Sequence, residues 1–240
     1  MIYLYIAAAI LLTVFLCNAV MTYIERGKYP FPGRTVSFDD EDIHLFACGN
    51  AENQKVIILH DCAECAPAVQ HFELAQKLSE KYRVIIAERC GYGWSGDTYA
   101  KRTAEDIVYE YRTALQGAGE NGEQYILVAF GAANEFAKYW SENFSDEVAR
   151  VAGVESKTAK NYGKVCNALI AAAREMGFLR IYNLFALKDA PDFGGNKKAY
   201  IALANSRTMS APMREELENF ASVSSENLKP EEELIKELLG

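Results

Sequence analysis

Three turn sequences that could carry catalytic groups follow short apolar runs in this chain of 240 residues. His60 and Asp61 end the first run, the segment 91–95 (GYGWS) lies shortly after the second, and 129–133 (AFGAA) ends the third. A sharp turn with small residues on both sides of its centre is the geometry that exposes a nucleophile for acyl transfer. Its centre here is Gly131, which has no side chain, so the turn is present without an attacking atom.

Two cysteines suggest a second chemistry. Cys62 and Cys65 follow an apolar run and precede a helical pattern, as in the segment CAECAP. This arrangement resembles the start of a thioredoxin-like redox protein, in which the first cysteine at a helix N-terminus has a depressed pKa. The turns at 91–95 and 129–133 have no counterpart in that fold, so dithiol chemistry stays an alternative. The six cysteines of the chain show no disulfide framework.

The elements that would position these turns alternate between strand and helix patterns. Apolar strand patterns cover 42–47, 55–60, 83–87, 125–129 and 150–154, and helical patterns cover 66–81, 103–116 and 132–143. Continuous apolar strands between helices predict an α/β domain, with a mostly parallel sheet covered by helices on both faces. After Ser156 only helical periodicity remains.

The order of these turns resembles the α/β-hydrolase superfamily, more narrowly its lipase- and esterase-like members with an N-terminal hydrophobic segment. In that family a His-Gly oxyanion loop, a Gly-Tyr-Gly-x-Ser turn and a G-x-S-x-G nucleophile elbow follow successive strands. The resemblance covers about 29–155. It implies an oxyanion region at His60, Asp61, Gly131 and Ala132, an acid at Glu155, and a helical lid after Ser156.

The chain departs from that pattern at each catalytic position. Gly131 replaces the nucleophilic serine, and Asp61 replaces the glycine of the His-Gly pair, where a carboxylate opposes oxyanion stabilisation if it points inward. The family's histidine follows the elbow, but all three histidines, His44, His60 and His71, precede it. The chain resembles the family without its last two strands, so we expect a C-terminally truncated and catalytically degenerate fold, a pseudoenzyme with a binding or interaction role.

The individual side chains have simpler structural interpretations as well. We expect His44 to be a packing or surface residue, His60 a structural residue and His71 a solvated one. Without a histidine, Glu155 has no triad role and is predicted to be a surface carboxylate. An active esterase or lipase with a displaced nucleophile, Cys62 or Ser95, is the alternative to the degenerate interpretation.

The N-terminal segment contains no charged residue from 1 to 24. Residues 2–24 would rise about 35 Å as a helix, enough to cross a hydrocarbon core of about 30 Å. We expect a single-pass transmembrane anchor over 1–24 and a linker over 25–34. Arg26, Lys28 and Arg34 follow the span and none precedes it, which favours a cytoplasmic globular part. A cleaved signal peptide is the alternative.

The remaining chain divides into a hydrolase-like core at 35–156 and a helical lid-like region with acidic C-terminal helices at 157–240. Eight glutamates from Met213 onward predict a solvated helical face. The net charge of −8 argues against a nucleic-acid partner. No motif predicts a cofactor or a metal site. The expected partners are the bilayer, through residues 2–24, and an apolar small molecule or a protein, which would bind between the strand ends and the helices over 162–187.

Overall fold

The computed structural model describes residues 1–38, 41–122, 124–156, 161–220 and 228–240. Its core is a six-stranded sheet in the order β1-β2-β4-β3-β5-β6. The strands are β1 (Arg34–Phe38), β2 (Glu41–Cys48), β3 (Lys55–Leu59), β4 (Arg83–Ala87), β5 (Tyr125–Phe130) and β6 (Val148–Val154). The last four are parallel to one another, and the pairs β1-β2 and β2-β4 are antiparallel.

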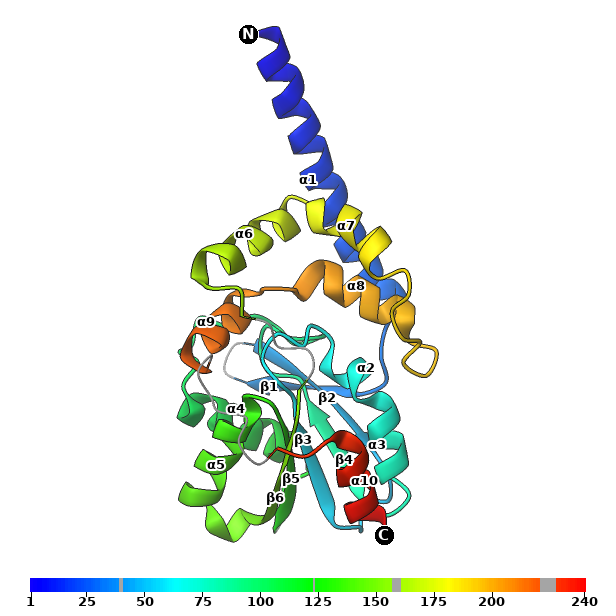
Figure 1. Ribbon diagram of the computed structural model, residues 1–240, viewed down its shortest axis with the longest axis vertical. Helices are drawn as coiled ribbons and strands as arrows, with labels where there is room; N and C mark the ends of the chain where they lie inside the picture. The colour runs from blue at the N-terminus through cyan, green and yellow to red at the C-terminus, as the bar shows by residue number, and fades with distance from the viewer. Residues whose placement is uncertain (39–40, 123, 157–160, 221–227) are drawn as a thin grey trace.

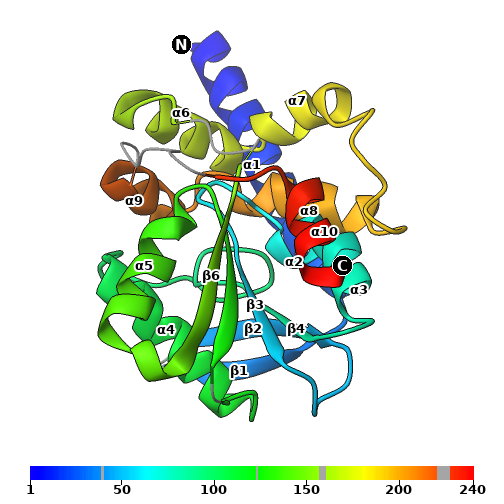
Figure 2. The ribbon, with the colours of Figure 1, turned by 60° about the horizontal axis from the view of Figure 1, so that its bottom comes forward.

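Helices cover both faces of this sheet (Figure 2). One face packs against α4 (Ala104–Gly117) and α5 (Ala133–Asn143), and the other against α3 (Phe72–Leu78) and the C-terminal α10 (Glu231–Leu239). The central strands are apolar along their length because both faces are covered: the side chains of Val56–Leu59 on β3 are fully buried. The mostly parallel α/β fold predicted from the sequence is therefore confirmed.

Four helices form a cap over the carboxyl ends of the parallel strands (Figure 1). These cap helices are α6 (Lys164–Glu175), α7 (Phe178–Ala186), α8 (Lys197–Arg207) and α9 (Ala211–Phe220). The N-terminal helix α1 (Ile2–Lys28) projects from this capped end. It is long and apolar enough to cross a membrane, with a mean hydropathy of 2.3 over its best window. Helix length and composition alone do not separate a membrane span from a signal sequence.

Several elements differ from the sequence-based predictions. Helix α1 continues through the first residues of the predicted linker and ends at Lys28, and β1 is a strand that the prediction lacked. The helix expected over 66–81 is broken at His71 into α2 (Pro67–Gln70) and α3. The predicted boundary between core and lid at 157 lies outside the described residues.

The last strand of the sheet, β6, is partly covered along its outer edge by the chain's own C-terminal segment. Lys229 donates its N–H to the carbonyl of Gly153 at 3.1 Å and accepts the N–H of Glu155 at 2.9 Å. Helix α10 follows and buries Leu234 and Leu238 against the core. Residues 228–240 therefore pack on the sheet rather than among the cap helices.

Candidate active site

The elbow lies between β5 and α5, at the carboxyl end of the sheet. Gly131 has a φ of +54°, a left-handed conformation that a residue without a Cβ adopts without steric cost. Its N–H donates to the carbonyl of Val154 on the neighbouring strand at 3.0 Å. The strained strand-to-helix turn that presents a nucleophile is thus present, with glycine at its centre.

The carboxylate of Asp61 fills the space in front of this turn. Its Oδ1 accepts the backbone N–H groups of Cys62 and Ala132, each at 2.8 Å. A Cβ added to Gly131 would lie 2.3 Å from Asp61 Oδ2, which is closer than any real contact. The carboxylate of Asp61 therefore binds the N–H groups of Cys62 and Ala132. It also occupies the space in which a side chain at position 131 would lie.

Asp61 is almost completely buried, and burial raises its pKa to about 6. That pKa is the net result: burial raises it most, the carboxylate of Glu64 adds to the rise, and the hydroxyl of Ser156 and the two amides oppose it. Near neutral pH the side chain is therefore largely ionised, and it places a negative charge between the two amide donors.

Two of the histidines flank Asp61, and both are buried. His60 accepts the N–H of Arg89 on Nε2 at 3.3 Å and donates from Nδ1 to the carbonyl of Asp61 at 3.1 Å. Burial and the charge of Arg89 hold its pKa well below the usual value, so the ring is neutral. Both nitrogens are engaged, and His60 has the structural role expected from the sequence.

The prediction that His71 is solvated is wrong. Its ring is buried, lies 4.3 Å from the ring of Phe130, and donates from Nε2 to Glu64 at 2.8 Å. Burial alone would lower the pKa of His71, but Glu64, with smaller contributions from Glu231 and Asp61, raises it. The break between α2 and α3 falls at this residue, and the sequence pattern did not reveal that turn.

His44 and Ser95 form a separate buried group around Glu88. His44 donates from Nδ1 to Glu88 at 3.0 Å, and its backbone N–H donates to Ser95 Oγ at 2.9 Å. The Ser95 hydroxyl donates in turn to the carbonyl of Glu88. Both hydrogen-bonding functions of Ser95 are used inside the fold, so this serine has no environment suited to a displaced nucleophile.

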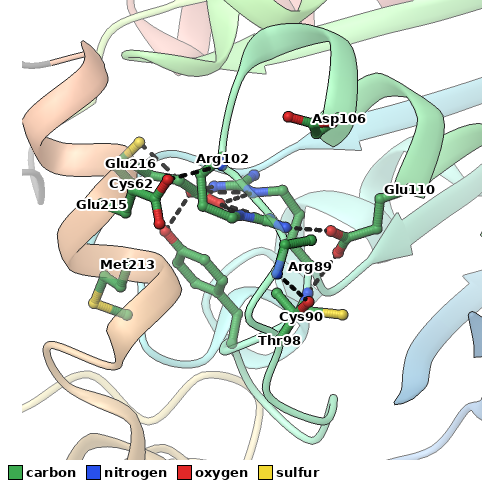
Figure 3. Close-up of polar contacts among 12 residues, drawn as sticks. Cys62, Arg89, Cys90, Thr98, Arg102, Asp106, Glu110, Met213, Glu215 and Glu216 are labelled. Carbon is green, nitrogen blue, oxygen red and sulfur yellow. Dashed lines mark hydrogen bonds and ion pairs between the residues drawn. The ribbon is translucent and has the colours of Figure 1, made fainter. Parts of the chain in front are cut away.

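A buried charge cluster, composed of Arg89, Arg102, Glu110 and Glu216, joins the cap to the core (Figure 3). Arg89 and Arg102 each lie 2.7 Å from the carboxylate of Glu216 on α9, and Arg102 also pairs with Glu110 on α4. Burial would raise the pKa of Glu216, but the two guanidinium groups outweigh it and lower the pKa.

The sequence did not reveal this cluster. The prediction that the glutamates after Met213 form a solvated face is wrong for Glu216, which is fully buried. Tyr92, from the GYGWS turn, donates its hydroxyl to the same carboxylate at 2.6 Å. The charge cluster could have been suspected from Arg89 and Arg102, which lie near that turn in the sequence, because a buried arginine requires an acidic partner.

Known structures have a similar fold. A bacterial membrane phospholipase A, described as a novel virulence factor, superposes with a TM-score of 0.54 at 16% identity, over 91% of this chain and 73% of its own. The hydrolase of E-2-(acetamidomethylene)succinate gives 0.55 at 14% identity, over 80% and 74%. The carboxylesterase CesB (YbfK) from Bacillus subtilis gives 0.54 at 15% identity, over 91% and 74%. These enzymes are α/β-hydrolases. The chain has an α/β-hydrolase fold. At these identities the likeness concerns the fold alone.

Comparisons of sequence give less information about this chain than the comparisons of structure. No family model matches the chain. The uncharacterized protein YbdG of Bacillus subtilis is 22% identical over 160 residues, which are 65% of this chain. The match covers 49% of YbdG, so this α/β-hydrolase-fold chain spans about half the length of that relative.

Asp61 Oδ1 accepts N–H groups from two loops at the carboxyl end of the sheet. The hole of this fold is made by the N–H of the residue after the nucleophile and by an N–H of the loop after the oxyanion strand. Ala132 follows the elbow centre, and Cys62 lies in the loop after β3. Both N–H groups donate to Asp61 Oδ1 at 2.8 Å.

The other predicted site residues lie apart from one another. Glu155 is exposed at the end of β6, and no histidine among the described residues lies in the family's base position. Cys62 and Cys65 are buried, Cys62 donates to Glu216 at 3.8 Å, and burial raises the pKa of both thiols, that of Cys65 to about 12. Reactive cysteines are partly exposed and have a lowered pKa, so these two have the opposite environment.

An apolar cavity of about 560 Å³ lies within the cap, above the loop that carries the two thiols. Residues of the predicted helical region over 162–187 line it, but none of the predicted pocket residues His60, Asp61, Gly131 and Ala132 does. Ligand sites in proteins have volumes of roughly 300 to 1,000 Å³ and mostly apolar walls. Three cap helices line it, with Ile170 and Ala173 on α6, Phe178 and Tyr182 on α7, and Tyr200 and Ala204 on α8.

Proposed function

We propose that this protein is a membrane-anchored α/β-hydrolase-fold protein without triad catalysis, with a binding role carried by the apolar cavity of its cap. The observation that carries the proposal is the position of Asp61, whose Oδ1 accepts both amides of the oxyanion hole at 2.8 Å. Triad hydrolysis requires those donors to be free for the charge that develops on the substrate.

The electrostatics of the site oppose acyl transfer. An ionised carboxylate already lies between the donors, so a substrate oxyanion would enter beside a charge of the same sign. The nucleophile is also missing at Gly131, and loss of a triad member costs roughly 10⁶ in turnover in a well-studied serine protease. Several independent features of one site thus favour a non-catalytic role.

The buried charge cluster supports a cap that stays closed over the strand ends. Separating α9 from the core would break the contacts of Glu216 with Arg89 and Arg102, and only Arg102 would keep an acidic partner, Glu110. Breaking a buried pair costs about 3–5 kcal/mol. We therefore infer that a ligand reaches the cap cavity without displacing α9.

Membrane anchoring through α1, with the globular part on the cytoplasmic side, belongs to the same proposal. The uncharged stretch 2–24 supports a span, and the basic residues that follow it support the orientation. An apolar ligand is also available at a membrane in greater amount than in water. The cavity and the anchor are thus consistent with one role, the binding of an apolar molecule at the membrane.

The absence of triad catalysis is tested with a fluorophosphonate probe on the full-length protein in detergent. We expect no labelling of the natural protein, whereas an active carboxylesterase treated in parallel labels fully. Gly131→Ser alone should not restore turnover, because the new side chain meets Asp61 and lacks a base. Stoichiometric labelling of the natural protein would overturn the proposal.

The binding role is tested with cis-parinaric acid, a fatty acid whose fluorescence rises in apolar surroundings. Ala173 lines the cavity, and its neighbour Ala172 is exposed on the same helix. We expect Ala173→Phe to weaken parinaric acid binding strongly and Ala172→Phe to leave it unchanged. Equal binding by both variants would place the fatty acid elsewhere on the protein.

The dithiol alternative is tested by maleimide modification followed by mass analysis. The exposed Cys166 should react in the native protein, while Cys62 and Cys65 should react only after unfolding. Rapid native modification of Cys62 would instead favour redox chemistry and argue against the binding role.

A further inference from the structure

The outer face of the cap carries a stripe of exposed apolar side chains. On α7, Phe178, Ile181, Tyr182 and Phe185 follow one another at helical spacing and are 45%, 51%, 65% and 79% exposed. In a soluble helix this stripe faces the core. Together with Leu184 on α7 and Val165 and Leu169 on α6, which are 64–75% exposed, these residues form what we term the cap apolar face.

The arginines of the two helices turn away from that face. Arg180 on α7 pairs with Glu25 of α1 at 2.7 Å and donates to Thr22 at 3.2 Å. Arg174 on α6 donates to the carbonyl of Thr208 at 3.0 Å. Both side chains are only 12–13% exposed. The two arginines thus point toward the protein, and the exposed charges of α6, Lys164 and Glu175, lie at the two ends of that helix.

Helix α1 fixes the height of this face relative to a bilayer. Its Asn18 donates to the carbonyls of Arg174 and Glu175 at 3.1 and 3.2 Å, and a Cβ on Gly177 would lie 3.3 Å from Val14. Only the part of α1 before Val14, residues 2–13, projects freely, and that part is about 18 Å long at 1.5 Å per residue. A hydrocarbon core is about 30 Å thick, so a spanning α1 draws the α6–α7 junction into its edge.

We infer that the cap apolar face is inserted into the boundary between headgroups and acyl chains, so that α1 and the cap together form one membrane-bound surface. The inference rests on the proposed anchoring through α1. Figure 1 shows α6 and α7 at the end of the domain from which α1 projects, as a contact in the membrane plane requires. Amphipathic helices with aromatic and aliphatic apolar faces bind bilayers in this way.

The insertion of the cap apolar face also indicates which kind of ligand the cavity binds. Phe178 and Tyr182 line the cavity and are also 45% and 65% exposed on the cap apolar face, so they lie at its mouth. An opening among inserted side chains faces acyl chains rather than water. The cavity therefore takes a single acyl chain of a membrane lipid or fatty acid, which enters from the side while α9 stays in place.

The insertion is tested on Cys166, an exposed thiol on α6 within the cap apolar face. The full chain carrying Cys17→Ser is labelled there with the fluorophore NBD and reconstituted into phosphatidylcholine vesicles. We expect a blue-shifted emission, quenching by lipids that carry a spin label on the acyl chain, and several-fold protection from aqueous iodide. A label at Glu142→Cys on α5, in a chain lacking Cys17 and Cys166, should show the reverse.

Each other result overturns the inference in a recognisable way. Iodide quenching at position 166 equal to that at 142 would place the face in water. Protection from both iodide and spin-labelled lipid would indicate a protein contact, such as a second copy of the chain. Failure of the protein to float with the vesicles would remove the anchor as well, whereas the fluorophosphonate result is independent of all three.

Discussion

The strand ends and the cap apolar face differ in whether their side chains have partners within the protein. At the strand ends, buried charged groups have partners within the protein: Asp61 accepts the N–H groups of Cys62 and Ala132, and Glu216 binds two buried arginines. On the cap, large apolar side chains have no partner within the described part of the chain. The polar groups of the first region are buried and paired, as in a protein interior. The apolar side chains of the second are exposed, as in an interface whose partner is absent.

Under the proposal of a non-catalytic hydrolase fold, this contrast indicates where its function is to be sought. A fold persists when its active site is lost, so function must be argued from the site that remains open. Here the open site is the apolar cavity with its mouth on the cap apolar face, about 560 Å³ in volume. Substitutions confined to one of these two regions test whether the other responds.

The largest effect is expected from Glu216→Ala. The substitution leaves Arg89 and Arg102 buried without their shared carboxylate, and Tyr92 without its acceptor. Removing one partner of a buried pair costs about 3–5 kcal/mol, so the free energy of unfolding should fall by that amount. Urea denaturation of the full chain in detergent measures it.

Glu218→Ala is the matched control, because Glu218 lies on the same helix and pairs with the largely exposed Lys164. Exposed pairs contribute about 0–1 kcal/mol. If both variants lost the same stability, the cluster around Glu216 would not be what holds α9 to the core.

A smaller effect of opposite sign is expected from Asp61→Asn. The folded pKa of Asp61 is raised to about 6 from 3.8, so the fold penalises the ionised form, and the stability of the natural protein falls as pH rises between those values. Two pKa units correspond to about 3 kcal/mol, which sets the upper limit of the gain from Asn at pH 8. At pH 4 the two proteins should be nearly equal in stability.

The comparison of denaturation at the two pH values separates this charge effect from a packing effect. Asp189→Asn, an exposed substitution in the loop after α7, should change stability at neither pH. A gain at pH 4 equal to the gain at pH 8 would show that the carboxylate of Asp61 is not ionised between the amide donors.

Much of the fold, and the position of its elbow, could be predicted from local patterns. The strands β3 to β6 are short apolar runs separated by helices, and Gly131 lies between small residues, so both could be recognised without contacts. Glu216 could not, because it meets Arg89 127 positions away in the chain, and an acidic helix gives no local sign of which carboxylate turns inward. The strand β1 follows a proline-containing segment, and its five residues carry too little periodicity to be recognised.

The smallest change in stability is expected from Leu184→Asp on the cap apolar face. Leu184 is 69% exposed, and substitutions at such positions usually change the free energy of unfolding by less than about 0.5 kcal/mol. Leu203→Ala on α8 is the comparison, since that side chain is 2% exposed and its loss should cost about 2–5 kcal/mol.

In vesicles the order of the two effects reverses. Leu184→Asp should expose NBD at Cys166 to iodide, while Leu203→Ala, measured under conditions in which it is still folded, should not. A leucine that matters for the membrane contact but not for folding distinguishes an interface from an interior. If Leu184→Asp destabilised the fold as much as Leu203→Ala, the cap apolar face would be part of the core.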